Sequence, residues 1–158
     1  IRTWLLSFRS APHRAFQPVG AMGRWNCHGV PMVYTARSPA AAALEMEAAW
    51  SMLSDLPGYY LHSCSFEPAD VRIAPPELGV ADLATTRAFG SAWAAARESV
   101  VLKVPSTAIH GTSCYLVNPR HPLSADRVWL ARRGRLHLKI DPNGHGGTAK
   151  NRGHRTWD

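Results

Sequence analysis

The beginning of the chain places short apolar runs between loops rich in proline and glycine. Apolar residues cluster from Arg2 to Phe8, which predicts a short edge strand, and the run from Val30 to Thr35 predicts a buried strand. Between the two, residues 10–22 are punctuated by proline and glycine and are expected to form a surface loop. The segment from Gly23 to Gly29 is then predicted to be a polar turn bounded by glycines.

Two segments have the pattern of helices. Ser38 followed by Pro39 is a typical helix start, because serine can cap free amides and proline fits the first helical position. The alanine-rich helix that follows is expected to extend to about Ser54. The segment 82–98 also has helical composition, although one glycine weakens it, and its apolar face is expected to carry Phe89, Trp93 and Ala96.

The second half of the chain is dominated by strand patterns. The proline-rich segment 68–79 is expected to be a loop. Further strands are predicted at Tyr59–Phe66, Val100–Val104, Ser113–Val117, Arg127–Leu130 and Leu136–Ile140. Strands outnumber helices and helices interrupt them, so the predicted class is α+β with a mixed sheet. We expect one domain over residues 1–142, followed by a polar, poorly ordered tail over 143–158.

Composition narrows the class of protein. The chain has 158 residues, 46% of them hydrophobic, which is typical of a folded globular domain. No apolar run is long enough to span a membrane, and the first residues lack a secretory signal, so no membrane partner is expected. Three cysteines at wide spacing argue against a disulfide framework and favour a reducing compartment. The sequence therefore predicts a cytoplasmic protein.

The positive charge lies mostly in the last third of the chain. The net charge is +7, and from Arg120 onward nine Lys or Arg stand against three Asp, which gives +6. Such a segment can contact nucleic acid, an acidic protein or a phosphorylated ligand, or simply form a solvated face. A nucleic-acid-binding module would use Arg127, Arg132, Arg133 and Arg135, but no aromatic residues interleave with this basic stretch.

Two charged residues are candidates for chemistry. On its predicted helix, Glu45 shares a face with small residues that cannot neutralise it, namely Ala41, Ala42, Ala48 and Ala49. Small residues let a helix approach a sheet closely, and burying an unpaired carboxylate is costly, so this glutamate has either a functional role or a solvated position. Arg24 lies in the glycine-flanked turn, where its guanidinium can hold phosphate oxygens or a backbone carbonyl.

The other candidate positions are polar or aromatic residues at strand ends. Tyr34 can stack on a flat heterocycle or belong to the core. Ser106 follows a strand and a proline, and without a Gly-x-Ser-x-Gly motif it favours hydrogen bonding over nucleophilic attack. Asn118 can orient a ligand or cap a turn. The histidines and cysteines lack the spacing of a metal site, so no metal is expected, and no glycine-rich nucleotide loop is present.

Taken in order along the chain, these segments resemble the RES-domain family, which is named after an arginine, a glutamate and a serine. Several matched segments in a fixed order are more specific than any single motif, and the likeness covers about Arg2 to Pro142. The matching segments are Gly23-Arg24-Trp25-Asn26, Gly29–Thr35, the Ser38-Pro39 helix with Leu44-Glu45, Val104-Pro105-Ser106, and Tyr115–Pro122. The sequence departs from the family pattern at Met22 and at Asn143.

The resemblance implies a fold, an activity and a partner. RES proteins resemble the ADP-ribosyltransferase fold and are typically toxins of bacterial toxin–antitoxin pairs, held inactive by an Xre-type antitoxin. They deplete NAD, their substrate, by phosphorolysis or hydrolysis of the nicotinamide–ribose bond, so inorganic phosphate is an expected co-substrate and no prosthetic group is needed. Some relatives instead transfer ADP-ribose to a protein. DNA would be contacted only through the antitoxin complex.

The resemblance also implies roles for individual residues. Glu45 would hold the ribose hydroxyls and stabilise the positive charge of an oxocarbenium-like transition state. Arg24 would grip the pyrophosphate, Tyr34 would stack near nicotinamide, and Ser106 would hydrogen-bond the nicotinamide or ribose. Supporting contacts to NAD are expected from Arg2, Asn26 and Asn118.

Overall fold

The computed structural model describes residues 1–18, 20–50 and 59–135. These residues form a seven-stranded sheet in the order β4-β5-β6-β2-β1-β3-β7, in which only the β4–β5 pair is parallel. The strands are β1 Arg2–Ser7, β2 Val33–Ala36, β3 Tyr60–Ser65, β4 Val71–Ile73, β5 Val101–Pro105, β6 Ser113–Val117 and β7 Trp129–Arg135. The helices are α1 Pro12–Ala15, α2 Pro39–Trp50, α3 Leu83–Ala96 and α4 Ser124–Arg127, with short 3-10 turns at Pro68–Asp70 and Pro76–Gly79. The fold is therefore α+β with a mixed sheet, as predicted.

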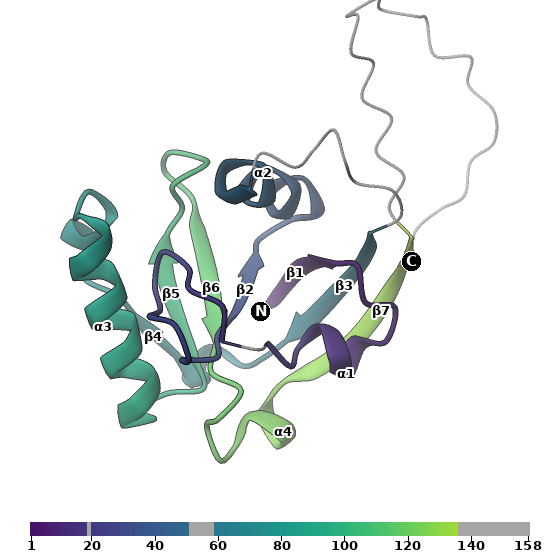
Figure 1. The fold of residues 1–158 in the computed structure, drawn as a ribbon. Coiled ribbons are helices and arrows are strands. Elements are labelled where there is room, and N and C mark those ends of the chain that lie inside the picture. The colour runs from purple at the N-terminus through teal and green to yellow at the C-terminus, as the bar shows by residue number, and fades with distance from the viewer. Residues whose placement is uncertain (19, 51–58, 136–158) are drawn as a thin grey trace, which may run out of the picture.

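One face of the sheet carries both long helices. The strand register pairs Ala36 of β2 with Trp4 of β1 and with Cys114 of β6, which places all three side chains on the same face. On this face, which we call the helical face, α3 packs on β5 and β6 through Trp93 and α2 packs on β1 and β2 through two alanines. Figure 1 shows the two helices well apart, α3 beside β4 and β5 and α2 near β2. The opposite face is covered by residues from the short segments, including Phe16, Phe66 and Val128.

The start of α2 follows the sequence prediction. The Ser38 hydroxyl oxygen accepts a hydrogen bond from the Ala41 backbone N–H at 3.1 Å, which satisfies one of the free amides of the first turn. Ala42 and Ala43 are buried against Leu6 and Ala36, so small side chains do let this helix approach the sheet. Ala48 and Ala49 are exposed, so the small face contacts the sheet only in the first half of the helix.

The helix α3 begins one residue later than predicted and has a different interior face. Asp82 caps it by accepting a hydrogen bond from the Thr85 N–H at 2.7 Å. The buried side is formed by Thr86, Gly90, Trp93 and Ala94, with Phe89 packed beside it, whereas Ala96 is exposed. Gly90 is the glycine that weakens the helical pattern in the sequence. Packing requires it, because a β-carbon at this position would lie 2.0 Å from the Trp25 carbonyl oxygen.

Three sequence predictions of elements are corrected. The strand β1 is not an edge strand, because β2 and β3 pair with its two sides. The segment 68–79 is not wholly a loop, because Val71–Ile73 pairs with β5 as the edge strand β4. The segment 10–22 contains the short helix α1, in which a proline occupies the first turn.

The other strand predictions hold within a few residues. The predicted strands 59–66, 100–104 and 113–117 are confirmed as β3, β5 and β6. The prediction for 127–130 is only partly right, since Arg127 ends α4 and the strand β7 starts at Trp129. The predicted strand 136–140, the end of the helix beyond residue 50 and the tail 143–158 lie outside the described residues. Among those that are described, no helix is long and apolar enough to cross a membrane.

Candidate functional site

The carboxylate of Glu45 is held by two side chains from the other half of the sheet. Ser106, which follows β5, donates its hydroxyl hydrogen to Glu45 Oε1 in a short hydrogen bond. Cys114 of β6 donates its thiol hydrogen to the same oxygen, with Sγ 3.1 Å from Oε1. We call Glu45, Ser106 and Cys114 the carboxylate cluster. It joins α2 to β5 and β6 at the end of the sheet where the chain leaves β5.

The orientation of Ser106 is set by its own backbone surroundings. Its hydroxyl oxygen accepts a hydrogen bond from the Ile109 N–H at 2.9 Å, and its backbone N–H donates to the Thr112 carbonyl at 3.0 Å. The turn between β5 and β6 therefore closes on this serine. Because the oxygen is an acceptor for Ile109, the hydroxyl hydrogen is available for the glutamate.

The thiol of Cys114 is protonated in this environment. Burial and the neighbouring Glu45 carboxylate both raise the pKa of Cys114. A thiol in this state is a hydrogen-bond donor rather than a nucleophile or a metal ligand. The half-buried glutamate thus has the partners that a solvated surface glutamate would lack.

Arg24 lies in a loop that α3 holds against the sheet. Its carbonyl oxygen accepts a hydrogen bond from the Thr86 hydroxyl at 2.8 Å, and the preceding Gly23 carbonyl accepts from Arg87 Nε at 2.8 Å. The guanidinium of Arg24 donates from Nη2 to the Ala81 carbonyl at 3.0 Å. Its Nε is buried and has no hydrogen-bond partner among the described residues. Because this Nε is enclosed, any donor that Arg24 offers to a ligand must come from the Nη groups, of which only Nη2 bonds a described residue.

Tyr34 and Asn26 organise the same loop from the sheet side. The Tyr34 hydroxyl donates to Asn26 Oδ1 at 2.7 Å and accepts from the Trp25 N–H at 2.9 Å. The Asn26 amide in turn donates to the carbonyls of Ala21 and Val30, each at 2.8 Å. Gly23 is packed against both side chains, since a β-carbon there would lie 2.5 Å from the tyrosine oxygen. The polar side chains of this turn point inward and fix its shape.

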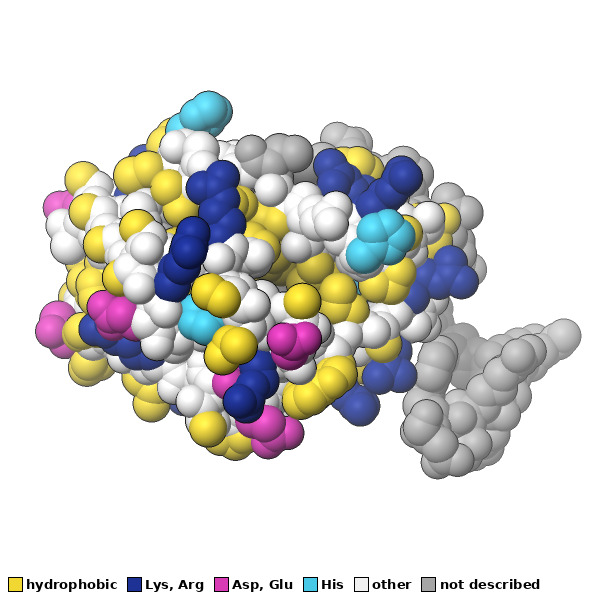
Figure 2. All heavy atoms as spheres, turned by 90° about the horizontal axis from the view of Figure 1, so that it is seen from below, with side chains coloured by type: hydrophobic (Ala, Val, Ile, Leu, Met, Phe, Trp, Pro, Cys, Tyr) yellow, Lys and Arg dark blue, Asp and Glu magenta, His cyan; other side chains and the backbone are white. Residues whose placement is uncertain are grey.

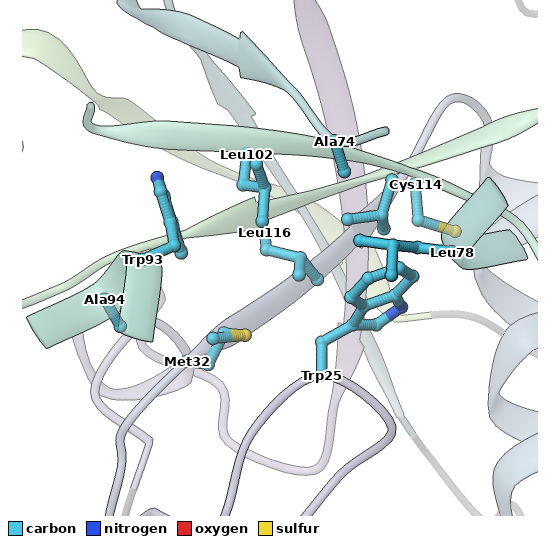
Figure 3. Close-up of a cluster of buried hydrophobic side chains, with 10 residues drawn as sticks. Trp25, Met32, Ala74, Leu78, Trp93, Ala94, Leu102, Cys114 and Leu116 are labelled. Atoms are coloured by element: carbon cyan, nitrogen blue, oxygen red, sulfur yellow. The ribbon is translucent and has the colours of Figure 1, made fainter. Parts of the chain in front are cut away.

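We call residues 23–27 the arginine loop. Trp25 connects this loop to the carboxylate cluster. Its side chain is 3% exposed and belongs to the same buried cluster as Cys114 and Leu78. Figure 3 shows the indole pointing from the loop toward these two side chains. Tyr34 also lies on the helical face, because it pairs with Leu116, two residues from Cys114 on β6. Arg24 therefore lies next to a tryptophan that is buried on the helical face, the same face that carries Tyr34 and the carboxylate cluster.

Neither of the two remaining candidates has a hydrogen bond to the carboxylate cluster. Arg2 is exposed on β1, on the same face as Trp4, and has no hydrogen bond or ion pair from its side chain to the rest of the described chain. Asn118 lies at the opposite end of β6 from Cys114, where its amide donates to the Ala94 carbonyl at 2.9 Å and its Oδ1 accepts from the Arg120 N–H. Both side-chain groups of Asn118 thus connect β6 to α3 and the next turn, and its role in ligand binding stays a prediction.

Two residues of this region, Cys114 and Arg87, are not marked as site residues by any pattern in the sequence. Cys114 is one of three widely spaced cysteines, and nothing in its spacing indicates a contact with Glu45. Arg87 is half-buried, and its positive charge acts to lower the pKa of Tyr34, although burial outweighs it and raises the pKa to about 12. Arg87 comes one residue after the buried Thr86 on α3, and this spacing does not indicate that its charge acts on Tyr34. Within the described residues, no three His, Cys, Asp or Glu side chains gather as a metal site.

Comparison with known proteins places this arrangement in a family. A protein named Toxin Res from Yersinia enterocolitica is 30% identical over 105 residues, which cover 63% of this chain and 69% of that protein. A protein named Prs ADP-ribosylating toxin from Sphingobium sp. is 31% identical over 117 residues, covering 63% and 68%. Among solved structures, the M. tuberculosis MbcT–MbcA toxin–antitoxin complex contains a chain with a similar fold, with a TM-score of 0.57 at 20% identity over 87% of this chain and 82% of that one.

The model of one family spans most of the sequence. It is described as the RES domain and matches residues 3–139, a range that includes every residue of the carboxylate cluster and the arginine loop. That Arg24, Glu45 and Ser106 are the arginine, glutamate and serine of the family name stays a prediction from the resemblance of their segments. The chain belongs to the RES domain family.

Proposed function

We propose that this chain is the toxin of a toxin–antitoxin pair and that it depletes NAD by cleaving the bond between nicotinamide and ribose. The observation that carries this proposal is the carboxylate cluster, in which a half-buried glutamate is oriented by two donors beside a loop with an arginine. The proposal is supported by family membership and by the names of the relatives, which describe toxins. We place its action in the cytoplasm.

The proposed chemistry needs a fixed negative charge more than it needs an acid. When the C1′–N bond of the nicotinamide riboside breaks, the bonding electrons move to the pyridinium nitrogen and neutralise it. The ribose carbon becomes electron-poor, as in other glycosyl cleavages, and a carboxylate beside the ribose stabilises it. Because nicotinamide leaves as a neutral molecule, no residue has to protonate it. Glu45 is the candidate for the stabilising carboxylate.

The remaining candidates bind and orient the dinucleotide. Arg24 is the candidate for holding the pyrophosphate through its Nη groups, because a planar guanidinium matches phosphate oxygens well. The Tyr34 ring is the candidate for stacking near nicotinamide, while its hydroxyl holds the loop through Asn26. Ser106 is the candidate for a hydrogen bond to nicotinamide or ribose, and Arg2 for a second phosphate contact. Asn26 and Asn118 are candidates for supporting contacts to NAD, and their amides also bond the backbone of the residues around them.

The acceptor that completes the reaction is phosphate or water. With inorganic phosphate, an oxygen of phosphate forms the new bond to C1′ and the product is a sugar phosphate. With water, the new bond is to hydroxyl and one proton is released to solvent. The two routes share the glutamate and differ in the product, so product identification in the presence and absence of phosphate separates them.

A second candidate function is the transfer of ADP-ribose to a protein. It is favoured by one observation, the name of the Sphingobium relative as an ADP-ribosylating toxin. The same carboxylate would stabilise the same ribose cation, and a side chain of the target protein would replace phosphate or water. This function predicts a labelled protein and little loss of bulk NAD.

We also propose an Xre-type antitoxin as the partner, with contact to DNA only through it. The solved neighbour is a complex of a toxin with its antitoxin, which supports a protein partner. The exposed basic side chains Arg120, Arg127 and Arg132 fit an acidic protein surface. Figure 2 shows one face of the molecule, seen from below, on which Lys and Arg side chains are spread among fewer acidic ones.

The test is an NAD-consumption assay with identification of the products. Replacing Glu45 by Gln removes the negative charge but keeps the size of the side chain, so we expect turnover to fall by at least about a hundredfold. The matched control is Glu67→Gln, an exposed glutamate after β3, which should keep wild-type turnover. Full turnover by Glu45→Gln contradicts the role of the carboxylate, and no NAD loss or protein labelling by the wild type contradicts both candidate functions.

A further inference from the structure

We propose that Cys114 is a positioning residue for Glu45, and that its thiol and the Ser106 hydroxyl together fix one carboxylate oxygen so that the other faces the substrate. The catalytic consequence rests on the proposed function, whereas the contact itself does not. Cys114 is neither the arginine, the glutamate nor the serine of the family name.

The location of Cys114 suits this role. It is 8% exposed and lies on the helical face of β6, an interior strand, between Val104 of β5 and Ala36 of β2. Paired strands on both sides hold its backbone, so the sulfur atom has a fixed position under α2. A group on a central strand positions its partner more precisely than one on a mobile loop does.

Both donors reach the same oxygen of the carboxylate. Ser106 Oγ and Cys114 Sγ each donate to Glu45 Oε1, and no described residue donates to Oε2. The final torsion of a glutamate side chain is broad, so a single hydrogen bond leaves the carboxylate plane loosely defined. Two donors on one oxygen restrict that rotation. They leave the lone pairs of Oε2 for the ribose hydroxyls and the developing cation.

The chemical state of the thiol fits a donor and excludes a nucleophile. The raised pKa keeps the sulfur protonated, because burial and the adjacent carboxylate both disfavour a thiolate. Cys114 belongs to a buried apolar cluster with Trp25 and Leu78, so the surroundings of the thiol away from the carboxylate are apolar. With the proton in place, the direction of donation is toward the carboxylate, which is an acceptor only.

The test compares three substitutions of Cys114 with one at a second buried cysteine. Cys114→Val keeps the approximate size but has no donor, whereas Cys114→Ser keeps a donor. We expect Cys114→Val to lower kcat about three- to tenfold, the scale of one lost hydrogen bond, with KM within about twofold. Cys114→Ala should behave like the valine variant, and Cys114→Ser should restore most of kcat. The control Cys64→Val removes a buried thiol bonded to Thr3 on the opposite face and should leave kcat unchanged.

Three results in the activity assay would overturn the proposal. They are an unchanged kcat in Cys114→Val, an equal loss in Cys114→Ser, and an equal loss in Cys64→Val. The last would show that any loosening of the core lowers turnover.

A second measurement tests the contact without using NAD. In a double-mutant cycle followed by thermal unfolding, Cys114→Val should lower the melting temperature more in the wild type than in Glu45→Ala. The reason is that the wild type loses a donor to a half-buried carboxylate, while the alanine variant has no carboxylate to satisfy. Additive shifts would overturn the inference. A wild type that neither consumes nor transfers NAD, but shows the coupling, would refute the proposed function and leave the contact established.

Discussion

At the scale of single residues, the hydroxyl of Tyr34 links the chemistry of one side chain to the shape of the arginine loop. It donates to Asn26 and accepts from the Trp25 N–H, so it satisfies two polar groups that are otherwise enclosed by the loop. Both neighbours are buried, Asn26 at 1% exposure and Trp25 at 3%. A substitution that removes only the oxygen therefore leaves two unmet hydrogen bonds rather than one.

The titration of Tyr34 predicts a loss of stability at high pH. Burial raises the pKa of Tyr34 from 10.0 to about 12, so the folded protein keeps this proton while the unfolded chain releases it. The stabilisation is fully present below pH 10 and is lost as the pH rises toward 12. We expect the free energy of unfolding, measured in urea, to fall across this window. Tyr34→Phe should be less stable at neutral pH, by about 1–3 kcal/mol, and should lack this part of the decline. A parallel decline in both proteins would contradict the assignment.

The residues of the site differ in how far the sequence predicts them. Ser106 donates a hydrogen bond to Glu45, a partner that the sequence does not indicate, and its expected hydrogen bond to nicotinamide or ribose stays a prediction. The alanine neighbours of Glu45 indicate that its side chain can point toward the sheet. Its hydrogen-bond donors, Ser106 and Cys114, come from the end of β5 and from β6, and no local sequence pattern predicts that these segments contact the helix. Cys114 could not be selected, because a cysteine within an apolar strand has the appearance of an ordinary core residue.

At the scale of elements, α3 is the support of the arginine loop. Thr86, Arg87 and Ser91 each bond the backbone of residues 23–27, at spacings that place them along one side of the helix. Gly90 lies among them and allows the loop backbone to touch the helix. The position of Arg24 thus depends on a contact that a single methyl group would disrupt.

We predict that Gly90→Ala destabilises the protein, although alanine is the better helix former. The gain in helix propensity is about 1 kcal/mol, but the added carbon would lie 2.0 Å from the Trp25 carbonyl oxygen and the loop must move. We expect a net loss of about 1–3 kcal/mol in urea unfolding, the range for overpacking a buried site. The control Ala92→Gly, at an exposed position of α3, should lose about 1 kcal/mol from propensity alone. A Gly90→Ala variant as stable as the wild type would mean that the loop is not held closely.

The elements themselves were largely predictable where the pattern is local. The cap of α2 and the apolar runs of β3, β5 and β6 are visible in the sequence and are confirmed. The strand β4 was missed because prolines at 68, 75 and 76 surround only three extended residues. The sheet position of β1 was predicted wrongly because apolar clustering shows that a strand is buried, but not how many neighbours it has.

At the scale of the whole molecule, the sheet has its first strand in the interior and two unlike edges. Among the residues that the structure describes, β1 is paired on both sides, whereas β4 has three residues and one neighbour. The strand β7 also has one neighbour there, with a register shift at Leu61/His62 of β3. Such differences in pairing should appear as differences in local stability across one domain.

Hydrogen exchange measures this difference directly. We expect the hydrogen-bonded amides of β1 to exchange only through global unfolding, so that their rates follow the free energy of unfolding in urea. The amides of β4 and of the register-shifted part of β7 should exchange faster, through local opening, and depend less on urea. Exchange from β1 that is as fast as exchange from β4 would contradict the central position of the first strand.

The separation of the cluster residues along the chain also sets an order in time. Ser106 and Cys114 follow Glu45 by 61 and 69 positions, and a ribosome adds about 5–20 residues per second. During synthesis, Glu45 therefore precedes the cysteine by roughly 3–14 seconds. For most of that interval the carboxylate has neither of its donors, and for all of it β2 lacks β6. If the proposed function holds, a growing chain is harmless until β6 has been made, and its first chance to consume NAD coincides with closure of the sheet.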